Sequence, residues 1–218
     1  MLKNIFFDFN GTLIDDLDFC VDIEKQVAKK AGIEPYSKEF YLETFSFPVR
    51  NFYKTVGLKD EDYVTLSSYF NSEYYSHYKE KTCLFDGVKN TLLDLKKSGF
   101  KVYCLSASPY EYLKNQLSFF EILDLFDGIC GATNNLANGK IDYGKIFIEE
   151  NKINPKETIM IGDTLHDYEV GKTFGFNCIL FSKGHNSKDR LLSSGAPVVD
   201  SYKEIYEEII KENEKAAN

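Results

Sequence analysis

Short apolar runs recur along the chain, and helical patterns separate them. The first run, Ile5-Phe6-Phe7, leads directly into Asp8 and then into an Asn-Gly turn. A run that is apolar on both faces is typical of a central strand in a parallel sheet. Alternating strands and helices favour such a sheet with helices on both faces, which is an α/β fold. The expected strands cover residues 4–9, 100–105, 128–131, 158–161, 177–181 and 197–199.

The stretch from residue 16 to 81 differs from the rest. It shows helical periodicity and no strand pattern, with Ser37 placed to cap one helix and Pro48 to open another. A helical stretch between two strands suggests an inserted domain. We therefore expect a core of residues 1–15 and 82–218, and a helical cap of residues 16–81.

Composition excludes several classes of protein. A formal net charge of −8 argues against a general nucleic-acid binder, which needs a basic face. No run is long enough to span a membrane, and the N-terminal apolar run is broken by Asp8, so no signal peptide is expected. The five cysteines form no CxxC pattern. We interpret them as reduced thiols in a cytoplasmic protein.

Polar residues stand where three of the expected strands end. Asp8 follows the first strand, Ser106 the second, and Asp163 the fourth, while the Ser182–His185 loop is a further strand-end candidate. In an open parallel sheet, ligands bind beyond the carboxyl ends of the strands. These side chains are therefore expected to converge on one site.

The residue types at these strand ends suit phosphoryl chemistry. Asp8 and Asp163 repel one another when close, and Mg²⁺ offsets that repulsion with its preference for oxygen ligands. An aspartate can attack phosphorus to form an aspartyl phosphate. The anion also needs donors, which the backbone of the Asn10-Gly11-Thr12 turn, the Ser106 hydroxyl and a lysine can supply.

Four motifs in order resemble the haloacid dehalogenase superfamily, whose hydrolases are mostly phosphatases. They are Asp8-Phe9-Asn10-Gly11-Thr12, Ser106 at a strand end, an upstream lysine, and Gly162-Asp163 followed by Asp167. The resemblance covers essentially the whole chain, and the overall pattern is most similar to the phosphoglycolate phosphatase-like branch. It implies a Rossmann-like three-layer core, an α-helical cap and a Mg²⁺ cofactor.

The resemblance also implies roles for individual residues. Asp8 resembles the nucleophile and a metal ligand, and the Asn10 carbonyl and Asp163 resemble further metal ligands. Asp167 resembles an acid of the metal site that supports the direct ligands from behind. Ser106, with the Ala107 amide, resembles the phosphate holder. Lys140 fits the family spacing, whereas Lys145 would lie on the body of a helix; we expect Lys140. The cap segment 45–53 is expected to face the site and to bring Arg50 to a substrate anion.

Asn10 departs from the family pattern, which has an acid/base aspartate there. An amide neither protonates a leaving alcohol nor activates water. Three interpretations stay open. The protein is a slow phosphatase or one for good leaving groups, the Asn replaces a native Asp, or the protein binds a phosphorylated ligand without turnover.

Another branch remains an alternative. Phosphonate hydrolases also lack this acid and use a cap lysine, for which Lys54 is the candidate. Dehalogenases fit less well, because the acidic pair of Asp163 and Asp167 is retained. The expected partner is a small phosphorylated metabolite, with no nucleic acid or membrane; the sequence gives no oligomeric signal. His166 and His185 are expected in loops, with surface or structural roles.

Overall fold

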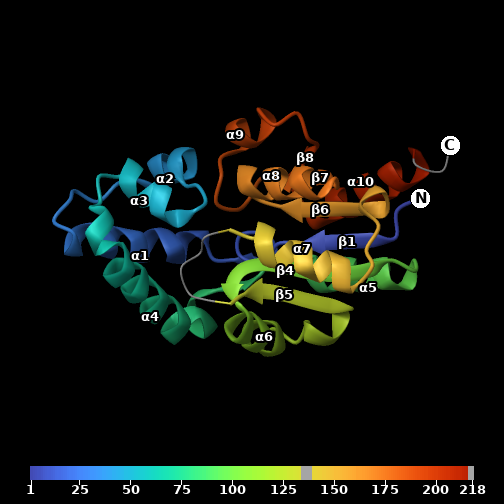
Figure 1. Ribbon diagram of the computed structural model, residues 1–218, viewed down its shortest axis with the longest axis horizontal. Helices are drawn as coiled ribbons and strands as arrows, with labels where there is room; N and C mark the ends of the chain where they lie inside the picture. Colours follow the sequence, from blue (N-terminus) through green and yellow to red (C-terminus); the bar gives the residue numbers. More distant parts are fainter. Residues whose placement is uncertain (134–138, 216–218) are drawn as a thin grey trace.

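The computed structural model describes residues 1–133 and 139–215. Six strands form one parallel sheet in the order β5-β4-β1-β6-β7-β8. The strands are β1 (Asn4–Phe7), β4 (Lys101–Pro109), β5 (Gly128–Ala132), β6 (Thr158–Gly162), β7 (Asn177–Phe181) and β8 (Val198–Val199). All six expected strands are present, so the parallel α/β fold is confirmed (Figure 1).

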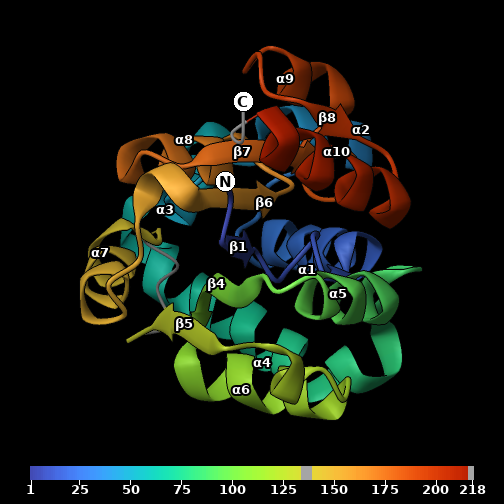
Figure 2. The same cartoon turned by 90° about the vertical axis from the view of Figure 1, so that its right-hand side faces the viewer.

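Helices cover both faces of this sheet. One face carries α5 (Val88–Lys97), α6 (Tyr110–Phe119) and α10 (Tyr202–Lys215). The other carries α7 (Ile141–Glu150) and α8 (Leu165–Phe174). Figure 2 shows α5 and α10 on one side of the strands and α7 and α8 on the other. The short helix α9 (Lys188–Leu192) and single 3₁₀ turns at Leu123–Leu125 and Pro155–Glu157 complete this part.

The β1 side chains fill both faces of the core. Ile5 and Phe7 point into the cluster under α5 and α10, whereas Phe6 points into the cluster under α7 and α8. This alternation follows from the two-residue period of a strand. All three side chains are fully buried, which at about 1.5–3 kcal/mol for each large apolar side chain anchors β1 at the centre of the sheet.

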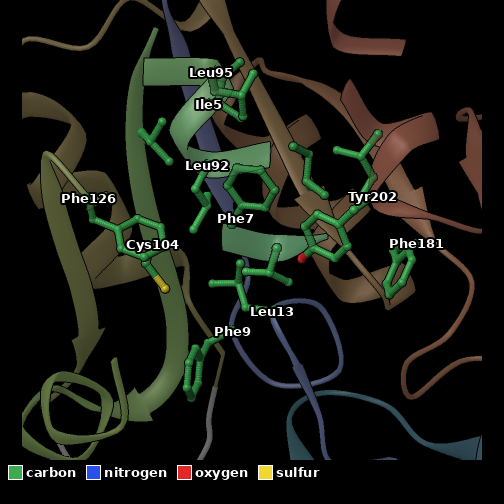
Figure 3. Packing of buried hydrophobic residues seen from close by; sticks show 14 of the residues in the cluster. Ile5, Phe7, Phe9, Leu13, Leu92, Leu95, Cys104, Phe126, Phe181 and Tyr202 are labelled. Atoms are coloured by element: carbon green, nitrogen blue, oxygen red, sulfur yellow. The ribbon is translucent and has the colours of Figure 1, made fainter. Parts of the chain in front are cut away.

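The turn after β1 is held against the hydrophobic core. Figure 3 shows Leu13 packed near Phe7 and Tyr202. The Tyr202 hydroxyl donates a hydrogen bond of 2.6 Å to the carbonyl oxygen of Thr12. The turn that carries the first motif is therefore held by packing and by a buried hydrogen bond.

Residues 16–81 contain only helices. They are α1 (Leu17–Lys30), α2 (Lys38–Thr44), α3 (Val49–Thr55), the 3₁₀ turn Asp60–Asp62 and α4 (Tyr63–Lys81). Short strands β2 (Ile14–Asp15) and β3 (Cys83–Leu84) pair antiparallel where the chain enters and leaves this segment. The helices enclose an apolar cluster of their own and lie beyond the end of the sheet in Figure 1.

Two expected details differ from the structure. The second strand was expected to cover residues 100–105, but β4 continues to Pro109 and α6 begins at Tyr110. The pairing of β4 with β5 shifts register between Leu105 and Pro109, which lets the strand bend past the sheet end. His166 was expected in a loop and instead lies in the first turn of α8.

Candidate active site

Three adjacent strands bring the candidate residues together. β1 pairs with β4 on one side and with β6 on the other, so Asp8, Ser106 and Asp163 meet at one end of the sheet. All three are nearly or fully buried. The expected convergence at the carboxyl ends of the strands follows from this register.

Lys140 lies between two carboxylates. Its Nζ is 2.6 Å from Asp8 Oδ1 and 2.6 Å from Asp167 Oδ1, and its side chain is 2% exposed. Burial lowers the pKa of Lys140, but the two carboxylates raise it more, so the ammonium is charged. Lys145 is exposed on α7. The structure therefore places Lys140, and not Lys145, in the site.

Three acids form a cluster at this site, and two of them, Asp8 and Asp167, contact the lysine. One carboxylate oxygen from each of Asp8, Asp163 and Asp167 lies within 4.8 Å of the others. Burial raises the pKa of Asp8, and it raises that of Asp163 to about 6. Burial also raises the pKa of Asp167, but the charge and hydrogen bond of Lys140, together with His166 and Thr164, lower it overall. Three buried carboxylates against one ammonium leave negative charge that a divalent cation with oxygen ligands would neutralise.

Asp167 is occupied by contacts to protein. Its Oδ2 accepts hydrogen bonds from the Thr164 backbone (3.0 Å), the Thr164 hydroxyl (2.7 Å) and the Asp163 backbone (3.2 Å). Its Oδ1 is bonded to Lys140. The Thr164 backbone contact, together with the Asp167 N–H that donates to the Thr164 hydroxyl oxygen at 3.3 Å, forms the capping box of α8. Such an arrangement favours a supporting role for Asp167 behind Asp8 and Asp163.

The glycine of the first motif allows close packing. Gly11 has a φ of +70°, and a Cβ there would overlap Asp163 and His185. Next to it, the Thr12 hydroxyl donates a 2.7 Å hydrogen bond to Asp163 Oδ1. Thr12 thus orients a candidate metal ligand. Neither Gly11 nor Thr12 is among the described residues that line the cavity.

The Asn10 amide is held at both ends. Its Nδ2 donates to Asp16 Oδ2 (2.7 Å) and to the Tyr74 hydroxyl (2.8 Å), and its Oδ1 accepts from the Ser108 hydroxyl (3.0 Å). Tyr74 also donates to Asp16 Oδ2 at 2.7 Å. Because an amide carries both a donor and an acceptor, the Asn10 side chain donates to Asp16 and accepts from Ser108 at the same time.

Sequence reasoning missed the roles of Asp16 and His185. The His185 ring is buried, with Nε2 3.1 Å from Asp16 Oδ1 and Nδ1 3.0 Å from the Tyr41 hydroxyl. Burial lowers the pKa of His185, but Asp16 raises it to about 9 overall. The His185 backbone N–H also donates to Asp163 Oδ2 at 2.6 Å. The only signal was the position of this loop after a strand.

A cavity of about 130 Å³ adjoins the site. Its floor includes Asp8, Asn10, Ser106 and Lys140 from the sheet side. The Ser106 hydroxyl oxygen accepts from the Ser108 N–H at 3.0 Å, which leaves its proton free to donate to a ligand. The opposite wall comes from the helical segment and includes the aromatic residues Tyr41, Phe45, Phe47, Tyr53, Phe70 and Tyr74.

Two cations expected near the site lie elsewhere. Arg50 pairs with Asp60 at 3.4 Å and lies over the Tyr63 ring, and Lys54 pairs with the same Asp60 at 3.3 Å. Neither borders the cavity among the described residues. The expectation that Arg50 faces a substrate anion is therefore wrong for this structure. The helix α3 turns Phe52 and Tyr53 inward and leaves these cations on its outer side.

Comparison with known proteins agrees with this geometry. The family model "Haloacid dehalogenase-like hydrolase" matches residues 5–181, and the chain belongs to this family of hydrolases.

Its relatives include phosphoglycolate phosphatases. One from Psychrobacter arcticus is 26% identical and covers 84% of both chains, and one from Aquifex aeolicus is 29% identical over 84% of this chain and 86% of its own. The crystal structure of a predicted phosphatase from Clostridium acetobutylicum superposes with a TM-score of 0.85 at 23% identity, covering 97% of this chain and 100% of that one. The fold and the membership of the haloacid dehalogenase-like hydrolase family are thereby confirmed, and the chain is similar to phosphoglycolate phosphatases.

Proposed function

We propose that the protein is a Mg²⁺-dependent phosphatase that hydrolyses a small phosphate monoester through an aspartyl phosphate. The contact of Lys140 with Asp8 beside Asp163 carries this proposal. A buried carboxylate that attacks phosphate needs cations to offset repulsion, and both a lysine and a cluster of cation-binding oxygens stand next to Asp8. Phosphatase relatives support the same reaction class.

Each residue of the site has its own role in the proposed reaction. Asp8 would attack phosphorus, while Lys140 opposes the rise that burial causes in the pKa of Asp8 and would offset charge on the phosphoryl oxygens. The Ser106 hydroxyl and the Ala107 backbone N–H, both at the cavity, would bind those oxygens. Asp8, Asp163 and the Asn10 carbonyl would hold Mg²⁺, which when bound supplies electrostatic stabilisation of the transferring phosphoryl group.

Because the Asn10 amide cannot transfer a proton, departure of the leaving group is the slow step of the proposed reaction. General acid–base help is typically worth about 10²–10⁴-fold, and Asn10 supplies none. We infer a slow enzyme that favours substrates with good leaving groups. We further infer that residues 16–81 act as a cap over the core of residues 1–15 and 82–218, because the cavity lies between them.

The setting of the reaction is inferred from the thiols and the helices. All five cysteines are free. Free thiols fit the cytoplasm. Over residues 1–133 and 139–215, none of the helices combines the length and apolar character of a membrane span. The proposed partner is a small phosphorylated metabolite and not a nucleic acid.

Hydrolysis of p-nitrophenyl phosphate with and without Mg²⁺ tests this function. Release of nitrophenol that needs Mg²⁺ and stops with chelator is expected. Equal rates with chelator would overturn the metal dependence. Absence of turnover on aryl phosphates, together with a rise in melting temperature on phosphate binding, would instead favour the binding protein. Lys54 pairs with Asp60 and is not among the described residues that line the cavity. Its position therefore gives no support to the alternative of a phosphonate hydrolase.

A further inference from the structure

A buried acid of the helical segment borders the cavity away from the nucleophile. Glu24 lies on α1, and only 3% of it is exposed. Its carboxylate accepts a 2.9 Å hydrogen bond from the Tyr36 hydroxyl and a longer one of 3.4 Å from the Tyr53 hydroxyl. In the parts of the chain that the structure describes, no lysine, arginine or histidine forms an ion pair with it.

Glu24 lacks the cation that a buried carboxylate normally has. Burial raises its pKa to about 8, and the two tyrosine hydroxyls only partly oppose this effect. A buried charge without a partner is costly, so the group is mostly protonated at neutral pH. A bound cation would restore the carboxylate form.

The surroundings of Glu24 suit an ammonium group. Tyr53 and Phe70 also border the cavity, and aromatic ring faces attract cations. Ser67 borders the same cavity, and its buried hydroxyl makes no hydrogen bond of normal geometry with the described residues. The Tyr63 hydroxyl is near enough for Ser67 to lower its pKa, although burial raises that pKa overall. The wall thus offers hydrogen-bonding capacity beside an acid.

The helix α1 sets the distance between the two ends of the cavity. Asp16, which contacts Asn10, stands just before α1, and Glu24 lies about two turns further along. At 1.5 Å per residue, this separation is on the order of 12 Å. A ligand that spans the cavity therefore needs a spacer between its phosphate and its far end.

We propose that Glu24 binds an ammonium group at the far end of the substrate. This inference rests on the proposed function, because it assigns the phosphate end to Asp8 and Lys140. The substrate class is a phosphate monoester of an amino alcohol, with an apolar or aromatic spacer that packs against the tyrosines and phenylalanines of the helical segment. Glu24 is a specificity residue and takes no part in the phosphoryl transfer.

Binding calorimetry with matched phosphonates tests this assignment without turnover. The probes are aminohexyl phosphonate and hexyl phosphonate, with Mg²⁺ at pH 7. The amino compound is expected to bind about tenfold more tightly or better, as hydrogen bonds to charged groups allow. It should also release about one more proton than the alkyl compound, because Glu24 ionises beside the ammonium. Buffers of different ionisation enthalpy measure that release.

Two variants separate recognition from folding. Glu24→Gln keeps the shape of the protonated acid, and it should remove both the preference and the extra proton release. Asp22→Asn, an exposed acid on the same helix, should keep both. Equal affinity of the two phosphonates for the unaltered protein, or an unchanged preference in Glu24→Gln, would overturn the proposal. Tyr36→Phe, which removes a hydrogen bond to Glu24 without a charge change, should weaken the preference less than Glu24→Gln.

Turnover then distinguishes the two levels of inference. If p-nitrophenyl phosphate is hydrolysed with Mg²⁺ but aminohexyl and hexyl phosphate have equal kcat/KM, only the assignment of the ammonium site fails. If the amino phosphonate binds in preference but no ester is hydrolysed, the ammonium site stands and the phosphatase proposal fails.

Discussion

The ammonium of Lys140 lies 2.6 Å from the carboxylate of Asp8, and both side chains are almost completely buried. This contact joins the end of β1 to the start of α7, two segments far apart in the sequence. Burial raises the pKa of Asp8 well above its ordinary value, and the Lys140 ammonium opposes this rise and so favours the ionised nucleophile.

Removing Lys140 should destabilise the fold. Lys140→Met leaves Asp8 and Asp167 buried without a counter-ion, which typically costs about 3–5 kcal/mol. Urea unfolding at pH 7 without Mg²⁺ measures this loss, and added Mg²⁺ should recover part of it. Lys145→Met, an exposed control on the same helix, should change the free energy of unfolding by less than about 0.5 kcal/mol. Similar losses in both variants would contradict a special role for Lys140.

Asp8→Asn should abolish turnover while the protein stays folded. The amide retains the size of the carboxylate but cannot form an aspartyl phosphate. Release of nitrophenol from p-nitrophenyl phosphate, with circular dichroism as the folding control, checks this outcome. Activity close to that of the unaltered protein would remove Asp8 from the mechanism.

Asn10→Asp should raise the rate on alkyl phosphates by about 10²–10⁴-fold. The gain should be smaller on aryl phosphates, because phenolate leaves without much protonation. The same change replaces the 2.7 Å donor to Asp16 with a second carboxylate, so the melting temperature should fall. Comparing kcat on both ester types with a thermal melt measures both effects. No gain on the alkyl ester means that the native chemistry uses no acid at this position.

Gly11→Ala should cost more stability than Gly32→Ala. Both glycines have positive φ, of +70° and +73°, so both variants carry similar backbone strain of about 1 kcal/mol. Only Gly11 has neighbours, Asp163 and His185, that an added Cβ would overlap. The extra loss should be about 1–3 kcal/mol in chemical denaturation. Equal losses would show that the turn relaxes freely.

Stability should fall as pH rises through the range in which Glu24 titrates. Its pKa is about 8 in the folded protein, above the ordinary 4.5, so the folded state binds the extra proton between these values. The contribution is complete below pH 4.5 and is lost as pH rises toward 8, by about 3–5 kcal/mol in total. Unfolding free energies of the protein and of Glu24→Gln should diverge accordingly between pH 5 and 8. Parallel curves would contradict the buried protonated acid.

The core fold and the main site could be read from the sequence because their signals are local. A buried parallel strand is apolar along its whole length, as in Ile5-Phe6-Phe7, and the proposed nucleophile Asp8 follows at once. Lys140 could be preferred over Lys145 only through the family spacing, and the structure shows why the choice matters: one lysine is buried between carboxylates and the other is exposed.

The cap was harder to read because orientation around a helix decides which residues reach the cavity. Arg50 and Tyr53 lie one turn apart on α3, yet Tyr53 borders the cavity and Arg50 pairs outward with Asp60. In the sequence, nothing distinguishes Glu24 from an ordinary exposed acid on a helix. Its burial depends on Tyr36 and Tyr53, which come from other segments of the chain.

The sequence by itself determined the order of strands and helices, the acidic and hydroxyl residues at the strand ends, and the family. These depend on the periodicity of apolar residues and on short motifs. Only the tertiary structure decided the environment of Asn10, which Asp16, Tyr74 and Ser108 fix from three separate elements. It also decided the partners of His185 and Glu24, because burial and charge at a side chain are set by distant segments that packing brings together.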